Sequence, residues 1–209
     1  MKDASKEERK RQIAQAAYTV LEKKGFSGAS MLAIAKAAKA SNETLYRWYG
    51  DKIGLFSELV ASNAEEVRTQ LERELEAKES PLEILGNVGP MLLSVLVGER
   101  AIALNRAAAA DGTGQLGKAI AKAGRDTIAP LIVQTLLRAR DLGELAFEDE
   151  HHAAGLYLDL LVGDMQIRRA IGQLPCPSHD EIHKRANTAL EQLCALLSPP
   201  ARALVLTPS

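Results

Sequence analysis

The segment Asn42–Lys52 constrains the fold of this chain more than any other. It predicts a short helix around Thr44, Leu45 and Tyr46, then a Gly-Asp turn and a lysine that opens the next helix. A basic first helix and a compact Ala/Ile-rich helix over 30–38 precede it. Two short helices after a longer one, with polar and cationic residues on the second, indicate a helix-turn-helix arrangement. Such an arrangement places a recognition helix in the major groove of DNA.

Capping residues define the predicted ends of these helices. Ser30, Ser41 and Asp51 each stand directly before a helical stretch, where a side-chain oxygen accepts a hydrogen bond from a free first-turn amide. The first helix is predicted to begin at the capping box Ser5–Glu8 and to end at Gly25, which follows two lysines. These signals are local, so they predict helix boundaries independently of the rest of the chain.

The remainder of the chain is also predicted to be helical. A long helix runs from Lys52 to about Lys78, and Ser80 followed by Pro81 and Glu83 is the clearest helix start in the sequence. Pro130 predicts a kink or restart in its helix. Further helices are expected at about 81–97, 101–110, 115–141, 148–172 and 178–198.

No window alternates with period two, so no sheet is expected. The predicted fold is all-α, with an N-terminal three-helix helix-turn-helix domain and a larger C-terminal helical domain. We assign 1–52 to the DNA-binding domain, 53–198 to an effector-binding and dimerisation domain, and 199–209 to a tail. The helix that starts at Lys52 belongs to both units, and Ser80 marks where the larger helical body begins.

The composition is that of a globular protein, since 46% of the 209 residues are apolar and 25% are charged. Neither a membrane span nor a secretory signal is predicted, because the apolar runs are short and the N-terminus is charged. We therefore expect a cytoplasmic protein with no membrane partner. Residues 1–52 hold 11 of the 26 lysines and arginines but only 6 of the 27 acidic residues. This basic end indicates a surface that meets a polyanion.

The sequence offers no set of residues suited to catalysis or metal binding. Cys176 and Cys194 lack metal-ligand spacing, and no Ser/His/Asp or Cys/His arrangement stands out. Residues 112–118 have the spacing of a phosphate-binding loop, but Ala119 replaces the hydroxyl that would hold Mg²⁺ and no strand precedes them. We therefore expect no metal, no cofactor and no enzyme activity, and an enzyme remains the most remote alternative.

A longer pattern extends through the helix-turn-helix segment. It comprises Gly25-Phe26, Ser30, Ile34-Ala35-Lys36-Ala37-Ala38, Ser41, Thr44-Leu45-Tyr46, Tyr49, Lys52 and Leu55-Phe56. In these residues the chain resembles the DNA-binding domain of TetR-type bacterial transcriptional regulators. The stretch from Asn105 to Ala154 is similar to one C-terminal subgroup of that family.

The chain departs from the family pattern at three positions. Lys39 stands where the family usually has glycine, Trp48 where histidine is common, and Tyr49 where phenylalanine is usual. If the backbone at Lys39 needs a positive φ, a lysine there costs about 1 kcal/mol. These departures leave the predicted fold intact and affect the fine docking geometry and the operator sequence.

Several side chains of the third helix are predicted to contact DNA. Thr44 can reach a phosphate or a thymine methyl, and Arg47 and Lys52 are the predicted phosphate clamps. Asn42 and Glu43 suit the base edges of adenine and cytosine, with a solvated helix face as the alternative.

Three further contacts are predicted beside these. Tyr46 resembles the family tyrosine whose hydroxyl contacts a backbone phosphate, and a buried tyrosine is its alternative. Trp48 either packs on the sugar-phosphate backbone or fills the domain core. Ser30, matched in the same resemblance, is also predicted to lie at the DNA.

The helix predicted at 148–172 is apolar on more than one side, which indicates burial on two fronts. One front can face a second subunit, with the last helix supplying the partner surface, and a purely intrachain core is the alternative. The predicted dimer interface comprises Leu156, Leu160, Gly163, Ile167, Ile182, Ala186, Ala189 and Leu193.

The resemblance also implies an effector pocket in the C-terminal domain. Tyr157, Leu161 and Met165 share one helix face, and Asn105 and Arg106 can add polar anchors. Plain core packing is the alternative for the apolar three. The low aromatic content of 4% favours a flexible or aliphatic effector.

The sequence thus predicts a homodimeric, ligand-responsive transcriptional repressor that binds a palindromic double-stranded DNA operator. A DNA-binding dimer without a small-molecule effector is the alternative.

Overall fold

The computed structural model describes residues 2–199, and within this range the chain is built from helices without a strand. The predicted all-α fold is therefore confirmed. In chain order the elements are α1 (Lys2–Gly28), α2 (Met31–Ala37), α3 (Asn42–Tyr49), α4 (Lys52–Glu76), α5 (Pro81–Val97), α6 (Glu99–Ala109), α7 (Gln115–Ile120), the π-helical turn η1 (Ala121–Arg125), α8 (Asp126–Asp141), α9 (Glu150–Val162), α10 (Met165–Ala170) and α11 (His179–Leu196). Of the predicted tail, all but Pro199 lies outside the described residues.

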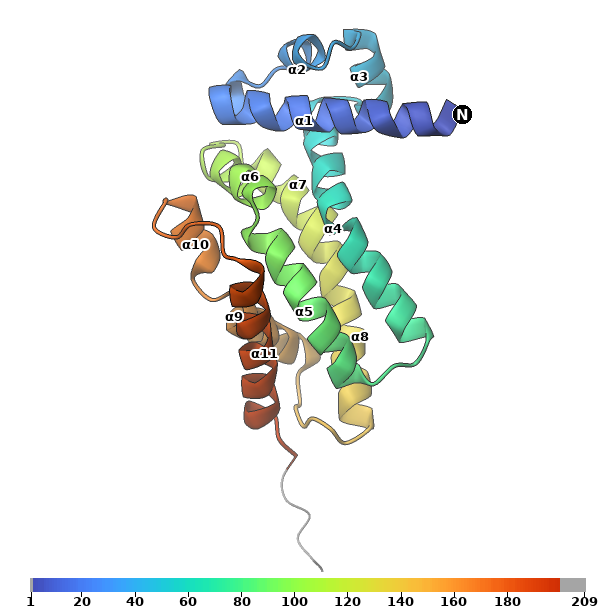
Figure 1. Ribbon diagram of the computed structural model, residues 1–209, viewed down its shortest axis with the longest axis vertical. Coiled ribbons are helices and arrows are strands. Elements are labelled where there is room, and N and C mark those ends of the chain that lie inside the picture. The colour runs from blue at the N-terminus through green and yellow to red at the C-terminus, as the bar shows by residue number, and fades with distance from the viewer. Residues whose placement is uncertain (1, 200–209) are drawn as a thin grey trace, which may run out of the picture.

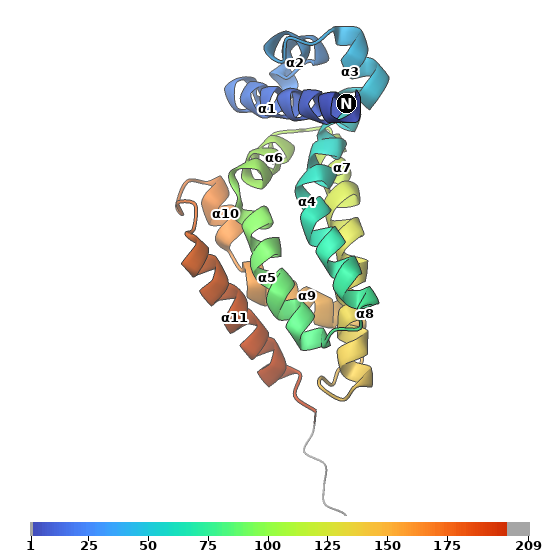
Figure 2. The same ribbon diagram turned by 45° about the vertical axis from the view of Figure 1, so that its right-hand side comes forward.

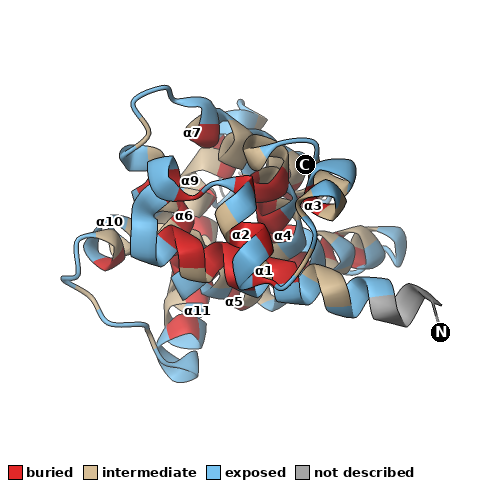
Figure 3. Cartoon of the chain, turned by 90° about the horizontal axis from the view of Figure 1, so that it is seen from above, coloured by how far each residue is buried: buried red, intermediate tan, exposed pale blue. Residues whose placement is uncertain are grey.

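Helix α1 lies crosswise over one end of the longer C-terminal helices, and α2 and α3 lie on its outer side (Figure 1). Helices α4, α5, α8 and α11 run roughly along the long direction of the molecule, and α4 links the two parts (Figure 2). Seen from the α2–α3 end, the buried residues gather where α1, α2 and α4 meet, whereas the outward surfaces are exposed (Figure 3). The helix-turn-helix is therefore presented at one end of the molecule.

The N-terminal core is built from the inner faces of α1, α2 and α3 and the first turns of α4. Its fully buried side chains include Ile13, Ile34, Leu45 and Phe56. The same cluster also takes in Leu104 and Ala107 of α6 and Leu116 of α7. The support beneath the helix-turn-helix thus comes partly from helices far along the chain.

The C-terminal body packs α5 against α4, α8, α9 and α11. Gly89 of α5 is needed for this packing, because a Cβ there would lie 2.9 Å from the Tyr157 hydroxyl and 3.4 Å from the Cβ of Ala186. Within residues 2–199 no single helix has the length and apolarity to cross a membrane; α5 and α6 would do so only as a pair bent by 51°.

Three predicted caps form as expected, and two do not. Ser30, Ser41 and Asp51 each accept a hydrogen bond from a backbone N–H of the helix that follows. The capping box predicted at Ser5 is wrong, because α1 already begins at Lys2. Helix α5 begins at Pro81 as predicted, but the Ser80 side chain makes no capping hydrogen bond.

Two long predicted helices are interrupted by the structure. The helix expected at 115–141 changes at η1, which lies ahead of Pro130, so the break predicted at Pro130 is misplaced and Pro130 is accommodated within α8. The helix expected at 148–172 ends at Gly163, whose φ of 53° favours glycine. A Cβ at Gly163 would also lie 2.7 Å from a guanidinium nitrogen of Arg185, so two constraints hold this break in place.

Candidate DNA-binding surface and ligand cavity

Helix α3 is anchored by one side chain and fixed at its start by one hydroxyl. Leu45 is fully buried in the N-terminal core. The Ser41 hydroxyl accepts from the backbone N–H of Thr44 at 3.0 Å and lies 2.8 Å from the Thr44 hydroxyl. The opposite face is open to solvent, with Tyr46 50% exposed and Arg47 also exposed. Since a buried tyrosine was the alternative for Tyr46, its exposure supports a role at the surface.

The other predicted DNA contacts on α3 are placed less uniformly. Glu43 is exposed, whereas Asn42 and Thr44 are half-buried, and the carbonyl oxygen of the Asn42 side chain is buried without a hydrogen-bond partner in the described residues. Trp48 is half-buried against the N-terminal core and meets Tyr49 edge to face at 6.3 Å. The placement of Trp48 therefore favours a role in the domain core over packing on the sugar-phosphate backbone.

Lys52 and Ser30 use their polar groups within the protein. The Lys52 ammonium donates to the carbonyl of Phe26 at 2.8 Å and sits 3.9 Å from the centre of the Phe26 ring. It therefore ties the start of α4 to the end of α1, a role that sequence reasoning missed because the partner lies 26 residues away. The Ser30 hydroxyl accepts from the backbone N–H of Ala33 at 3.1 Å as a helix cap.

The turn between α2 and α3 has the conformation that the family's glycine would suit. Lys39 has a φ of 51°, and the N–H of Ala40 donates to the carbonyl of Ala35 at 2.9 Å, which closes the end of α2. The lysine is therefore held in a left-handed conformation that a side chain disfavours.

A basic groove of about 390 Å³ between α1 and α2 was not predicted as a site. Three exposed lysines, Lys23, Lys24 and Lys36, line it together with Ser30. The sequence contained the signal as excess positive charge, but only the packing of α2 on α1 brings these lysines together.

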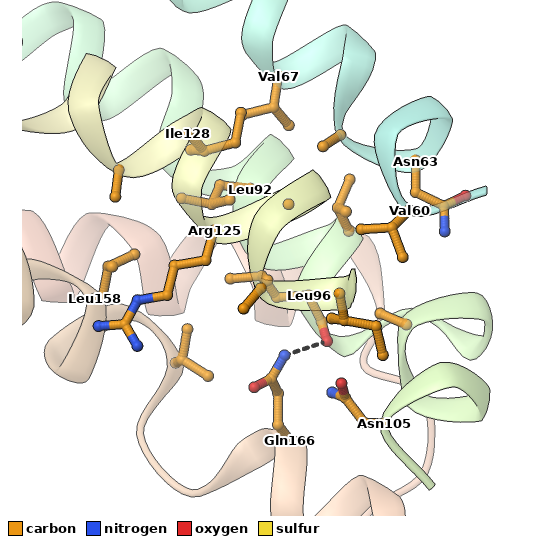
Figure 4. Close-up of a pocket in the computed structure, with 18 of the residues that line it drawn as sticks. Val60, Asn63, Val67, Leu92, Leu96, Asn105, Arg125, Ile128, Leu158 and Gln166 are labelled. Carbon is orange, nitrogen blue, oxygen red and sulfur yellow. Dashed lines mark hydrogen bonds between the residues drawn. The ribbon is translucent and has the colours of Figure 1, made fainter. Parts of the chain in front are cut away.

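A larger cavity of about 590 Å³ lies inside the C-terminal body. Aliphatic side chains form most of its wall (Figure 4), including Val60, Val67, Leu92, Leu96, Ile128 and Leu158. Its polar residues are Asn63, Asn105, Arg125, Asp159 and Gln166. Among the described residues that line it none is aromatic, so the cavity offers dispersion contacts rather than ring stacking.

Some polar side chains of the cavity already have a partner within the protein, and others do not have one among the described residues. The Gln166 side chain donates to the carbonyl of Leu96 at 2.9 Å. Arg125 reaches into the region between Leu158 and Gln166 (Figure 4), and within residues 2–199 it makes no ion pair. A bound molecule would therefore meet one positive charge, Arg125, and one negative charge, Asp159, at the cavity wall.

Of the five residues predicted for the effector pocket, Asn105 lines the cavity. Arg106 instead donates to the carbonyls of Arg169 and Ala170, at 2.9 and 2.6 Å, and ties α6 to α10. Tyr157 and Leu161 are buried in the core, and Met165 is half-buried against it. This agrees with plain core packing, the alternative considered for these three residues.

Helix α9 therefore turns a different face to the cavity than the sequence suggested. The Tyr157 hydroxyl donates to the carbonyl of Leu85 at 3.1 Å, and burial raises the pKa of this tyrosine well above its usual value. The cavity is faced by Gly155, Leu158, Asp159 and Val162, which share the neighbouring stripe of α9. The sequence signal that could have located the cavity was the presence of glycines inside the predicted helices, because a glycine leaves space where a side chain would stand.

The predicted dimer-interface residues fall into separate environments. Ile182, Ala186, Ala189 and Leu193 are buried within the one chain. Gly163 lines the cavity, and Leu156 and Leu160 are half-buried against the C-terminal core. Ile167 is 59% exposed, and Ile171, just after α10, and Leu196, at the end of α11, are both 63% exposed. Outside this region Leu142, just after α8, and Leu32 of α2 are also exposed.

Comparisons with known proteins agree with this geometry. Residues 13–59 match the family model described as bacterial regulatory proteins, tetR family. Residues 83–196 match the model described as AefR-like transcriptional repressor, C-terminal domain. No curated protein sequence matches the chain significantly.

Solved structures share the fold over most of their length. A TetR-family transcriptional regulator from Mesorhizobium loti is 26% identical, with a TM-score of 0.72 over 92% of this chain and 98% of that one. The flavonoid-responsive regulator FrrA is also 26% identical, with a TM-score of 0.66 over 93% and 99%. FadR from Bacillus subtilis, in complex with stearoyl-CoA, is 18% identical, with a TM-score of 0.71 over 88% and 97%, a likeness of fold.

The two family models together cover both the helix-turn-helix end and the cavity-containing body. The chain belongs to the TetR family of bacterial transcriptional regulators, which bind DNA through the helix-turn-helix.

Proposed function

We propose that the protein is a homodimeric repressor that releases a palindromic operator when a small molecule fills the cavity. One observation carries this proposal: the cavity shares its wall with the core beneath α3. Val60 and Leu104 line the cavity and also belong to the buried N-terminal cluster. A change in the cavity therefore acts directly on the packing that supports the recognition helix.

The DNA-contacting surface is proposed to centre on Tyr46 and Arg47, with Thr44 and Glu43 beside them. The exposure of Glu43, Tyr46 and Arg47 on α3 supports this, because side chains that read or clamp DNA must be free in the unbound protein. Thr44 is half-buried, and its hydroxyl lies 2.8 Å from the Ser41 hydroxyl. Lys23, Lys24 and Lys36 line the basic groove and extend the positive surface along α1 and α2. Lys52 contributes mainly by holding α4 on α1.

The dimer is proposed to form through the C-terminal helices. The exposed apolar side chains Ile167, Ile171 and Leu196 support this, since a symmetric partner would cover them. In such a dimer the two recognition helices enter successive major grooves, about 34–36 Å apart. An effector that favours another spacing weakens the complex, and a coupling of about 1–3 kcal/mol changes affinity about 5–150-fold.

The effector is proposed to carry an aliphatic body and an anionic portion. The aliphatic wall of the cavity supports the first feature, and Arg125, which forms no ion pair among the described residues, supports the second. The related structures point to two kinds of ligand, since FrrA is flavonoid-responsive and FadR from Bacillus subtilis holds stearoyl-CoA. The absence of aromatic side chains from the lining favours the acyl type over a planar ring system.

DNA binding is tested by fluorescence anisotropy with genomic fragments selected by the wild-type protein, starting with the DNA upstream of its own gene. Tyr46→Phe and Arg47→Ala should each weaken binding about 3–10-fold, because each removes a phosphate contact. Lys184→Ala, an exposed cation of α11, is the matched control and should leave affinity unchanged. If no fragment binds better than random DNA, the proposal fails.

The effector is tested by adding lauroyl-CoA, stearoyl-CoA or a flavonoid to the DNA complex and to thermal melts. We expect the acyl compounds to raise the melting temperature and release DNA, and Arg125→Gln to weaken both effects. Gly155→Leu should block them by filling the cavity, since a Cβ at Gly155 meets nothing within 4 Å. Gly155→Ala, which leaves most of the cavity open, is its control. A protein that binds its operator but responds to none of these compounds would favour a DNA-binding dimer without such an effector.

A further inference from the structure

A hydrogen bond joins the cavity to the first helix of the DNA-binding unit. Asn63 of α4 lines the cavity beside Val60 (Figure 4). Its side-chain amide donates to the hydroxyl of Tyr18 at 2.8 Å. Tyr18 lies on α1, is only 4% exposed and belongs to the N-terminal core. The two residues are 45 positions apart in sequence, so the bond is a tertiary link between the two functional parts.

The Tyr18 side chain is held by two helices that line the cavity. Besides Asn63 of α4, Arg100 at the start of α6 lies over its ring, with the guanidinium carbon 5.6 Å from the ring centre. Helix α6 continues into Leu104 and Asn105, which form part of the cavity wall. Burial raises the pKa of Tyr18, and a hydroxyl buried in this way is costly to leave without a hydrogen-bond partner.

Among the described residues, the Tyr18 hydroxyl has one hydrogen-bond partner, the side-chain amide of Asn63, from which it accepts. A molecule that crowds this end of the cavity, or that offers its own acceptor to the amide, turns the Asn63 side chain away. The Tyr18 hydroxyl is then left buried without that partner, and the contact between α1 and α4 weakens.

We propose that the Asn63–Tyr18 hydrogen bond transmits cavity occupancy to the DNA-binding unit, with Asn63 as a positioning residue for α1. This inference rests on the proposed function, because it assumes that the cavity regulates DNA binding. Filling the cavity breaks the bond, alters the seating of α1 on α4, and lowers affinity for DNA. One hydrogen bond of this kind accounts for about a fivefold change.

The test needs no knowledge of the natural effector, because a side chain can fill the cavity from within. Gly117 of α7 lines the cavity, a Cβ there meets nothing within 4 Å, and α7 packs beside α4. Gly117→Leu therefore serves as the probe of occupancy. Gly117→Ala is the matched control, since it changes the helix backbone in the same way but fills little space.

DNA affinity is measured by anisotropy on a fragment selected by the wild type, for Gly117→Leu and Gly117→Ala, each alone and combined with Tyr18→Phe. Gly117→Leu should weaken binding about fivefold in the wild-type background and less than about twofold in Tyr18→Phe, where the bond is already absent. Asn63→Ala provides a second background in which the same bond is missing, and circular dichroism confirms that each variant is folded.

Equal weakening by Gly117→Leu in both backgrounds would overturn the inference and leave the proposed function standing. So would an unchanged affinity in Gly117→Leu relative to Gly117→Ala. Failure of the wild type to bind any fragment would overturn the proposed function, and this inference with it.

Discussion

The two halves of this protein are packed on different principles. The helix-turn-helix end is organised by local signals: each of its three short connections ends in a side-chain cap, and Leu45 anchors α3 in a filled core. The C-terminal body also has side-chain caps, at Asp149 and Ser178, but it contains in addition an uncapped start at Ser80, a π-helical turn, a broken helix at Gly163, and a cavity of about 590 Å³. The difference is what the proposed function requires, since a DNA-reading surface needs a fixed shape and a ligand site needs space.

The irregular elements of the body lie where that space is. The turn η1 and the glycines at 117, 124 and 155 all line the cavity. Side chains around a void lack contacts on one side, so they add less to stability than side chains in a filled core. The two halves should therefore respond differently to the same substitution.

The largest contrast is expected for core leucines. Leu45→Ala should destabilise the protein by about 3–5 kcal/mol, because it leaves a new cavity in a filled core. Leu92→Ala should cost about 2 kcal/mol, because Leu92 already borders empty space. Urea unfolding of both variants measures the difference, with Leu32→Ala, 51% exposed, as the surface control. Equal losses at Leu45 and Leu92 would contradict the contrast between filled and open packing.

Helix caps provide a second contrast of about 1 kcal/mol. Ser41→Ala removes a formed capping bond and should destabilise the protein by about 1 kcal/mol. Ser80→Ala should change stability by only about 0.2 kcal/mol, because the Ser80 side chain makes no such bond. Thermal melts of the pair decide the point, and a loss at Ser80 as large as that at Ser41 would show that its hydroxyl caps α5 in solution.

The smallest expected effect concerns two lysines in the left-handed conformation, one in the helix-turn-helix and one at the end of the helix that links it to the C-terminal body. Lys39 has a φ of 51° and Lys78 a φ of 57°, at the ends of α2 and α4. Replacing either with glycine should stabilise the protein by about 0.5–1 kcal/mol, as the relief of strain exceeds the added freedom of the unfolded chain. Alanine at the same positions is the control and should give no gain. A destabilised Lys39→Gly would mean that the lysine side chain makes a stabilising contact that outweighs its strain.

The helix-turn-helix could be predicted because its determinants are close together in the sequence. A cap and the helix that it starts span only a few residues, so Ser41 and Asp51 were sufficient evidence. Gly25, predicted as the end of the first helix, instead has a φ of 65° at a kink inside α1, which continues to Gly28. The family resemblance, in which a glycine usually stands at the position of Lys39, pointed to the positive φ that the structure has there.

The cavity-lining residues could not be predicted in this way, because α9 is apolar on two sides and the sequence does not state which side meets the void. That choice depends on the rotation of α9 against α5 and α11, where the Tyr157 hydroxyl finds the carbonyl of Leu85. Lys52 shows the same limit, since its partner Phe26 is brought close only by the packing of α4 on α1.

The shared wall of the cavity has a consequence for how this regulator can acquire new specificities over evolutionary time. A substitution at Val60 or Leu104 alters both the proposed ligand site and the core beneath the recognition helix, so we expect few such changes to be tolerated. Gly155 and Leu158, on the far wall, belong to α9 and lie outside that core. Under the proposed function, variation there can change the preferred ligand while operator recognition is conserved.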